Sequence, residues 1–325
     1  MLSSYTAGIL PHTYQIYLTV FMKQLLYLLL FFATPLFGQA PTNGLIAYYP
    51  FNGNADDASG NGNNGIVQTA TLTTDRLGSA NSAYRFSEGA KIIVSNSPSL
   101  VLSNAFTVNG WFNLRSFTGR DGNSGALSPN GTHVLFSKDC DRDWLYALLI
   151  IQDKPRGYLS GCTWPGSLSY FLNFTTDAWT HMAISYSGTF MKLYINGLLI
   201  AASASPNTFA ATNQRDLYIG GMACWPYFFS GDLDDFRFYN RDLTDDEVKA
   251  TFIAENGTIQ SVRAGNWLEV NTWSCNCIPT VANPVLVKHM VQIPANETGY
   301  AYTMKEILGG QVVLASTAKL QLTHP

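Results

Sequence analysis

The segment MKLYINGLLI, residues 191–200, decides the fold class of this 325-residue chain. Apolar side chains alternate from Met191 to Ile195, which places them on one face of a β-strand. Asn196 and Gly197 follow, and this dipeptide readily adopts the two positive φ angles of a type I′ turn. The segment therefore predicts a tight antiparallel hairpin.

Short strand-like runs separated by Gly, Asn, Asp and Ser extend from about residue 44 to about residue 256. The continuous apolar run 145–151 predicts a strand that is buried on both faces. Thr244 and Glu247 have the spacing of a capping box, so one short helix is expected to begin there. This pattern predicts an all-β, two-sheet antiparallel sandwich that ends in a helix.

The sequence argues against a nucleic-acid partner and against a transmembrane segment. The formal net charge is −3, only 13% of the residues are charged, and Lys and Arg form no cluster, so the chain has no basic surface for nucleic acid. No apolar run reaches the roughly 18 residues that a transmembrane helix needs. We therefore expect neither a nucleic-acid partner nor a transmembrane segment.

The N-terminal region has the pattern of an export signal. Basic Lys23 precedes the apolar run 25–32, and small residues follow at Gly38 and Ala40. Residues 22–40 are therefore interpreted as a signal peptide, whereas a buried helix is the alternative. Residues 1–21 are interpreted as an upstream extension that results from a wrongly assigned start codon. The chain is expected to be secreted or to lie on a bacterial cell surface.

Five cysteines occur in a chain that is expected to reach an oxidising compartment. One disulfide among the first three is plausible, and the last two lack partners at zinc-binding spacing. The pairing stays open. The cysteines are Cys140, Cys162, Cys224, Cys275 and Cys277.

Six motifs occur in the order that one known family shows. They are YYPFNGNADDASGNGNNG (48–65), FTVNGWF (106–112), WTHMAISYSG (179–188), KLYINGLL (192–199), LYIGG (217–221) and GDLDDFRFYNRDLTDDEV (231–248). The chain thus resembles the laminin-G-like, concanavalin-A-like (pentraxin-like) jelly-roll family. The resemblance implies two antiparallel sheets packed face to face over residues 41–256. Sandwiches of this type include lectins, adhesion modules and some glycanases, so the fold does not decide the function.

The composition changes after residue 256. Trp267 and Trp273 are followed by brief β segments at nearly regular spacing. This stretch resembles the start of the β-solenoid segments that are often attached to such domains on bacterial surface proteins. Residues 257–325 are therefore predicted to form a small β-rich tail with two or three rungs.

A calcium site is predicted where the resemblance brings two distant segments together. Oxygen-bearing side chains alternate in the loop that begins at residue 57, and glycines allow a sharp turn there. In the family an aspartate of the penultimate motif commonly completes such a site. Alternatively, the loop is only a turn whose side chains cap backbone amides. The predicted ligands are Asp57, Ser59, Asn61, Asp234 and Asp235.

Aromatic residues in predicted loops are the candidates for ligand binding. Exposed aromatic faces on the rim of a sandwich can stack on sugars or on a protein partner. Loop packing beside a disulfide is the alternative role. The candidates are Trp144, Trp164, Trp225 and Tyr227.

The sequence offers little support for catalysis. No pair of glutamates has the alternating spacing that a retaining glycosidase needs, and no nucleophile motif or metal-binding histidine pair is present. The alternating Asp139, Asp141 and Asp143 are the best acidic cluster, in a predicted loop. We therefore expect a non-catalytic recognition module for a glycan or an extracellular protein, assisted by calcium. The alternatives are a glycan hydrolase or lyase, and a structural spacer.

Overall fold

The computed structural model describes residues 40–322 of the chain, with gaps. The segments left out within this span are 103–104, 121–124, 130, 139–145, 152–153, 160–166, 171–175, 205–213, 224–225, 275–277 and 280–282. All five cysteines, the Asp139 cluster, the upstream extension and nearly all of the predicted signal peptide therefore lie outside the described residues. Within the described part, no helix is both long and apolar enough to cross a membrane.

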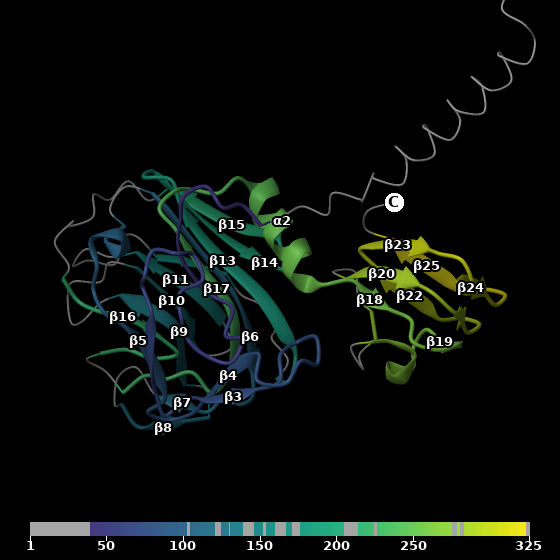
Figure 1. The fold of residues 1–325 in the computed structure, drawn as a ribbon, viewed down its shortest axis with the longest axis horizontal. Coiled ribbons are helices and arrows are strands. Elements are labelled where there is room, and N and C mark those ends of the chain that lie inside the picture. Colours follow the sequence, from purple (N-terminus) through teal and green to yellow (C-terminus); the bar gives the residue numbers. More distant parts are fainter. Residues whose placement is uncertain are drawn as a thin grey trace, which may run out of the picture. The chain divides into compact units, whose positions relative to one another are not determined.

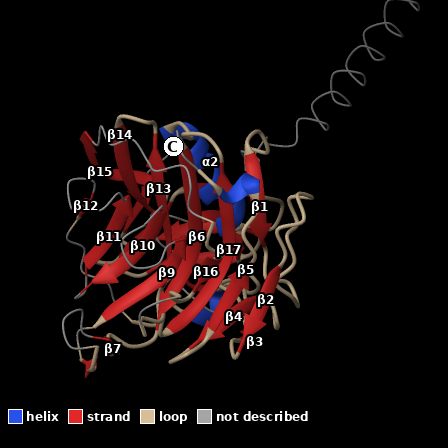
Figure 2. Ribbon diagram, turned by 90° about the vertical axis from the view of Figure 1, so that its left-hand side faces the viewer, coloured by secondary structure: helices blue, strands red, loops and turns tan. Residues whose placement is uncertain are grey.

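The first of two large antiparallel sheets, sheet A, has eight strands in the described residues (Figures 1 and 2). Its strands, in spatial order, are β15 (Leu198–Ala204), β14 (Phe190–Ile195), β13 (Trp179–Tyr186), β6 (Phe106–Leu114), β17 (Gly231–Tyr239), β4 (Ala83–Phe86) and β3 (Thr71–Thr73), and β1 (Leu45–Tyr49) also pairs with β17. Three pairs of neighbours in this order, β13 and β6, β6 and β17, and β17 and β4, are far apart in sequence, as in a jelly roll.

The second sheet, sheet B, has nine described strands and lies opposite sheet A. Its strands are β12 (Ser167–Ser169), β11 (Lys154–Leu159), β10 (Tyr146–Ile151), β9 (Thr132–Lys138), β16 (Leu217–Ile219), β5 (Lys91–Val94) and β2 (Gly65–Gln68), with β7 (Gly119–Arg120) and β8 (Leu127–Ser128) at one side. The continuous run predicted to be buried on both faces is β10, in which Leu148 and Leu149 are both buried.

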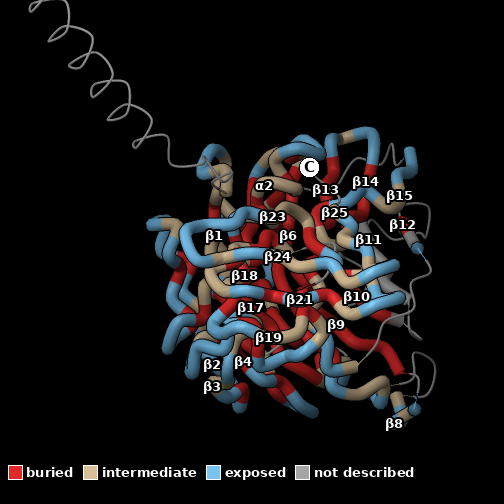
Figure 3. Tube along the Cα trace, turned by 90° about the vertical axis from the view of Figure 1, so that its right-hand side faces the viewer, coloured by how far each residue is buried: buried red, intermediate tan, exposed pale blue. Residues whose placement is uncertain are grey.

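One hydrophobic core fills the space between the sheets (Figure 3). Alternate residues of each strand face it, so β6 contributes Phe106, Val108 and Phe112, while β16 contributes Leu217 and Ile219. The intervening residues point away from the core, and we call the side on which they lie the outward face of each sheet. The prediction of an all-β two-sheet sandwich is confirmed.

Two local predictions are also confirmed. Asn196 and Gly197 have φ angles of 49° and 73°, and they join β14 to β15. Helix α2 (Asp245–Asn256) begins with a complete capping box between Thr244 and Glu247. Short 3₁₀ helices occur at Pro98–Leu100 and Val270–Thr272.

Helix α2 covers part of the outward face of sheet A. Val248 of the helix lies in one buried apolar cluster with Ala183, Tyr194 and Tyr239, which come from three strands of that sheet. Figure 1 shows α2 beside β14 and β15. This part of the outward face is therefore closed to ligands.

The tail is a stack of parallel strands with its own core. Three small sheets run β18–β20–β23, β19–β21–β24 and β22–β25, and every pairing in them is parallel. The strands are β18 (Ile259–Gln260), β19 (Gly265–Asn266), β20 (Pro284–Val287), β21 (Met290–Ile293), β22 (Thr298–Ala301), β23 (Thr303–Glu306), β24 (Gln311–Leu314) and β25 (Lys319–Leu322). This arrangement is a short β-solenoid, as the sequence predicted.

Candidate functional site

The loop predicted to bind calcium is held together by its own hydrogen bonds. The Asp57 carboxylate accepts from the backbone N–H groups of Tyr48 (2.9 Å), Ser59 (2.8 Å) and Asn63 (3.0 Å). The Asn61 side-chain amide donates to Ser59 Oγ at 2.9 Å. These contacts match the alternative role, in which the aspartate caps backbone amides in a turn.

The other two predicted ligands already have a cation between them. Arg76 donates to Asp234 at 2.5 Å and to Asp235 at 2.7 Å. Burial and the charge of Asp235 raise the pKa of Asp234 to about 8 even though Arg76 opposes this shift. The ion pair with Arg76 and the raised pKa both weaken the Asp234 carboxylate as a calcium ligand.

The structure does not gather the five predicted ligands around one point. The Tyr48 backbone N–H binds Asp57, whereas the Tyr48 hydroxyl donates to Asp235 at 2.6 Å, so the two carboxylates lie at opposite ends of one tyrosine. Among the described residues, no group of three or more His, Cys, Asp or Glu side chains could hold a metal ion. Calcium binding therefore stays a prediction.

Calcium titration of the exhaustively chelated protein tests this prediction. If the ion binds only the folded state, stability rises by about 2.7 kcal/mol at a hundredfold excess over Kd. Asp57→Ala and Asp234→Ala should each abolish that rise. Asp245→Ala should keep it, because Asp245 lies at the start of α2 and pairs with Lys192 of β14, away from the predicted ligands. A melting temperature that calcium leaves unchanged in the wild type would contradict the prediction.

A buried polar network joins the end of α2 to sheet A. Glu255 of the helix accepts a hydrogen bond from Trp111 Nε1 at 2.8 Å and forms an ion pair with Arg237. Arg76 donates from Nε to the Glu255 carbonyl oxygen at 3.1 Å, and its guanidinium lies 4.5 Å from the Trp111 ring centroid. His181 is fully buried here, and burial lowers its pKa to about 3. These buried contacts hold the end of α2 against sheet A, so these residues have a structural role.

Of the four predicted ligand-binding aromatics, only Tyr227 is described; Trp144, Trp164 and Trp225 lie outside the described residues. Tyr227 is partly exposed and packs against an apolar cluster on the outward face of sheet B. The members of that cluster are Val134, Ala147, Leu149 and Met222. Tyr227 therefore lies on the outward face of sheet B.

A second aromatic residue that the sequence analysis did not select lies on the same face. Tyr218 alternates with two core residues of β16, so its partly exposed ring points outward. Lys91 Nζ lies 5.4 Å from the centre of that ring. Tyr218 pairs with Ile93 of β5, and Ile93 pairs in turn with Ile66 of β2. The exposed fraction of Ile66 is 63%.

Lys91 also lies near the backbone of Tyr227. A methyl group added at Gly221 would lie 3.4 Å from Lys91 Cβ and 3.5 Å from the Tyr227 carbonyl oxygen. The two tyrosines, the lysine and the two isoleucines all lie on the outward face of sheet B, and we call this set of residues the Tyr218 surface. The alternation in LYIGG was the sequence signal that could have identified Tyr218.

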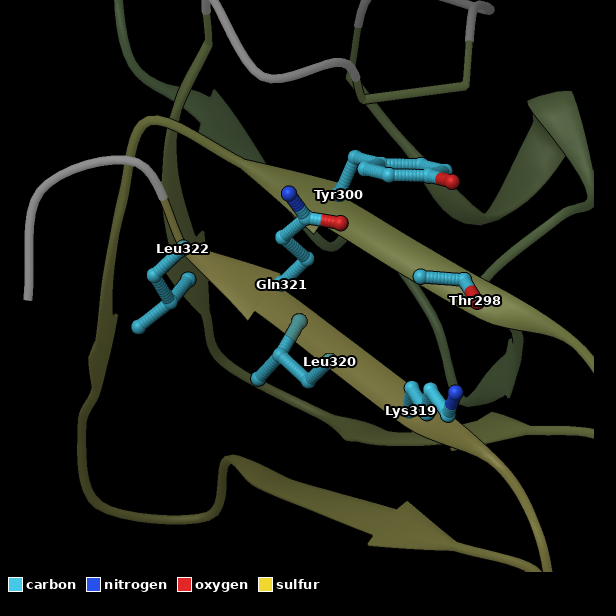
Figure 4. A pocket seen from close by; sticks show the side chains of 6 residues that line it. All are labelled: Thr298, Tyr300, Lys319, Leu320, Gln321 and Leu322. Carbon is cyan, nitrogen blue, oxygen red and sulfur yellow. The ribbon is translucent and has the colours of Figure 1, made fainter.

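The tail carries a separate open depression of about 690 Å³ on the β22–β25 sheet (Figure 4). Tyr300 and Gln321 lie next to each other on the two paired strands and form part of its lining. Its other lining residues are Thr298, Lys319, Leu320 and Leu322. This depression offers one aromatic ring, whereas the Tyr218 surface combines two rings, an exposed aliphatic side chain and a cation.

Two antiparallel sheets around one core, with crossovers between distant strands, define a jelly-roll sandwich of the concanavalin A type. The model of the concanavalin A-like lectin/glucanases superfamily matches residues 86–249, and the chain belongs to this family. No curated protein matches the sequence.

Solved structures similar to the chain include bacterial toxin binding domains. The binding domain of Paraclostridial Mosquitocidal Protein 1 has a TM-score of 0.52 and 18% identity, over 67% of this chain and 53% of that one. The botulinum neurotoxin serotype D ligand-binding domain in complex with N-acetylneuraminic acid has a TM-score of 0.50 and 16% identity, over 66% of this chain and 52% of that one. The botulinum neurotoxin DC binding domain in complex with SialylT has a TM-score of 0.50 and 13% identity, over 68% of this chain and 54% of that one. The chain thus spans about half the length of each of these proteins, and at this identity the likeness establishes the fold alone.

Proposed function

We propose that the sandwich is an extracellular carbohydrate-binding module that holds a saccharide against the Tyr218 surface. The observation that carries this proposal is the pair of partly exposed tyrosines, Tyr218 and Tyr227, on the outward face of sheet B. Aromatic faces combine a large apolar contact area with a polar group at one end, which suits a sugar ring. The toxin binding domains in complex with sialic-acid ligands support a recognition role for this fold.

Charge and burial favour binding over glycan cleavage. Glycosidases use two carboxyl groups that reach the substrate. Asp232, Asp234 and Glu255, the buried carboxylates of sheet A and α2, are each paired with arginine. Export, which residues 22–40 predict, would place the module where extracellular glycans occur. A glycan-degrading enzyme and a structural spacer are the outcomes against which the proposal is tested.

Tyr218→Ala should weaken glycan binding at least tenfold, about 1.4 kcal/mol. The substitution removes the ring on which the sugar stacks, and tyrosine is enriched among residues that dominate binding. A glycan array selects the ligand, and calorimetry then compares the wild type with Tyr218→Ala. Tyr300→Ala is the matched control, because Tyr300 is 40% exposed and lies in the tail.

Three results would contradict the proposal. Unchanged affinity in Tyr218→Ala, measured on a variant that melts at the wild-type temperature, would exclude this surface. Release of shortened sugars from the bound glycan would favour the enzyme. An array without any bound glycan would favour the spacer or a protein partner.

A further inference from the structure

The outward face of sheet A carries a row of four polar or aromatic residues on neighbouring strands. Trp179 pairs with Asn113, Asn113 with Asp232, and Asp232 with Arg85, so the row crosses four adjacent strands, β13, β6, β17 and β4. Figure 2 shows these strands side by side. Directly paired residues point to the same face of a sheet. Trp179 is partly exposed.

Asp232 holds two arginines in place. Its side chain is fully buried, and it accepts from Arg85 Nε (2.7 Å) and Nη2 (3.2 Å) and from Arg115 Nε (3.0 Å) and Nη2 (2.8 Å). The two arginine side chains are nevertheless 48% and 41% exposed. A buried carboxylate thus orients two guanidinium groups whose outer edges face solvent.

The outer edges of both guanidinium groups keep unused donors. A guanidinium has five N–H groups. Arg85 uses two of them on Asp232, and Arg115 uses two on Asp232 and one on Asp177, at 2.7 Å. Among the described residues, three N–H groups of Arg85 and two of Arg115 therefore have no protein acceptor. With Asp232 the pair carries one net positive charge, which Asp177 offsets: its side chain is 60% exposed, pairs with Arg115 and also lies close enough to Arg85 to add to the effect of Asp232 in raising the pKa of that arginine.

Asn113 adds an unsatisfied acceptor to the same row. It is 3% exposed, and its side-chain oxygen has no hydrogen-bond donor in the described part of the chain. A buried polar atom without a partner is unfavourable, so Asn113 marks a position in the row where a donor is missing. Oriented guanidinium donors, an amide acceptor and an indole therefore share one row.

We propose that this row is a second binding site, which takes a saccharide that bears a carboxylate, such as a uronic acid. The planar carboxylate matches the forked donors of Arg85 and Arg115, as it matches arginine in bidentate pairs. The sugar ring lies toward Trp179, two strand spacings or about 10 Å from Asp232. The row is on the sheet opposite the Tyr218 surface, so this inference goes beyond the proposed function and does not depend on that surface.

Calorimetry with a galacturonic acid trisaccharide tests the site. The wild type should bind the acid at least tenfold more tightly than its methyl ester, which has the same sugar rings without the charge. A sulfated galactose trisaccharide of equal length should bind more weakly than the acid, because its anion is tetrahedral rather than planar. Equal binding of acid and ester, or no measurable binding of the acid, would overturn the proposal.

Two conservative variants separate binding from folding. Arg85→Lys and Arg115→Lys keep the charge beside Asp232 but remove the forked donors, so each should weaken binding of the acid at least tenfold. Arg263→Lys is the control, since Arg263 forms an exposed ion pair in the tail. Wild-type affinity in both variants would mean that the arginines only neutralise Asp232. Tyr218→Ala should bind the acid normally, which distinguishes failure of this site from failure of the Tyr218 surface.

Discussion

Glu255→Ala should lower the free energy of unfolding of the sandwich by about 3–5 kcal/mol, the range for removing one partner of a buried ion pair. The Glu255 side chain is 4% exposed and pairs with Arg237, whose side chain is 9% exposed. It also accepts the hydrogen bond of Trp111 Nε1. Alanine therefore leaves a buried charge and a buried N–H group without their acceptor. Urea unfolding followed by tryptophan fluorescence measures the loss.

Glu247→Ala is the matched control, because it is the same substitution in the same helix. Glu247 accepts from Thr244 N–H at 2.9 Å and pairs with Arg241, and this arginine lowers the pKa of Glu247 to about 2. Its side chain is 32% exposed, so the expected loss is about 1 kcal/mol, typical of a helix cap. Equal losses in the two variants would show that the buried network contributes no more than an exposed cap.

The contrast between these two glutamates explains what the sequence could predict. The role of Glu247 follows from its spacing to Thr244, because a capping box is a local pattern. The role of Glu255 depends on Trp111 and Arg237, which are distant in sequence and meet it only in the folded sandwich. The hairpin at Asn196-Gly197 was predictable for the same local reason.

The predicted calcium ligands illustrate a second limit. Strand β17 has an irregular register between Asp234 and Arg237, and Asp235 has a φ angle of 50°. A bulge of this kind breaks the alternation of side chains, which allows Arg76 to reach both aspartates. Simple strand periodicity cannot predict this arrangement. The row of Trp179, Asn113, Asp232 and Arg85 depends likewise on pairings between strands that no local pattern specifies.

The tail should unfold separately from the sandwich, because each has its own buried core. The tail core contains Trp267 and Trp273, whose ring centroids are 4.8 Å apart, together with residues from its parallel strands, and none of its members belongs to the core of the sandwich. A fragment of residues 40–256 should accordingly fold alone. Calorimetry should resolve two transitions in the full chain, and one of them should match that fragment.

Trp267→Ala should lower the stability of the tail by about 3–5 kcal/mol and leave the sandwich transition unchanged. Trp267 is fully buried, and its carbonyl oxygen accepts from Trp273 Nε1 at 2.7 Å, so the smaller side chain leaves a cavity beside the second indole. Val270→Ala is the control in the same segment, because Val270 is 48% exposed and its loss should be small. A single transition that shifts as a whole in Trp267→Ala would show that the two cores unfold as one unit. A molten 40–256 fragment, ordered only when the tail is attached, would move the domain boundary away from residue 256.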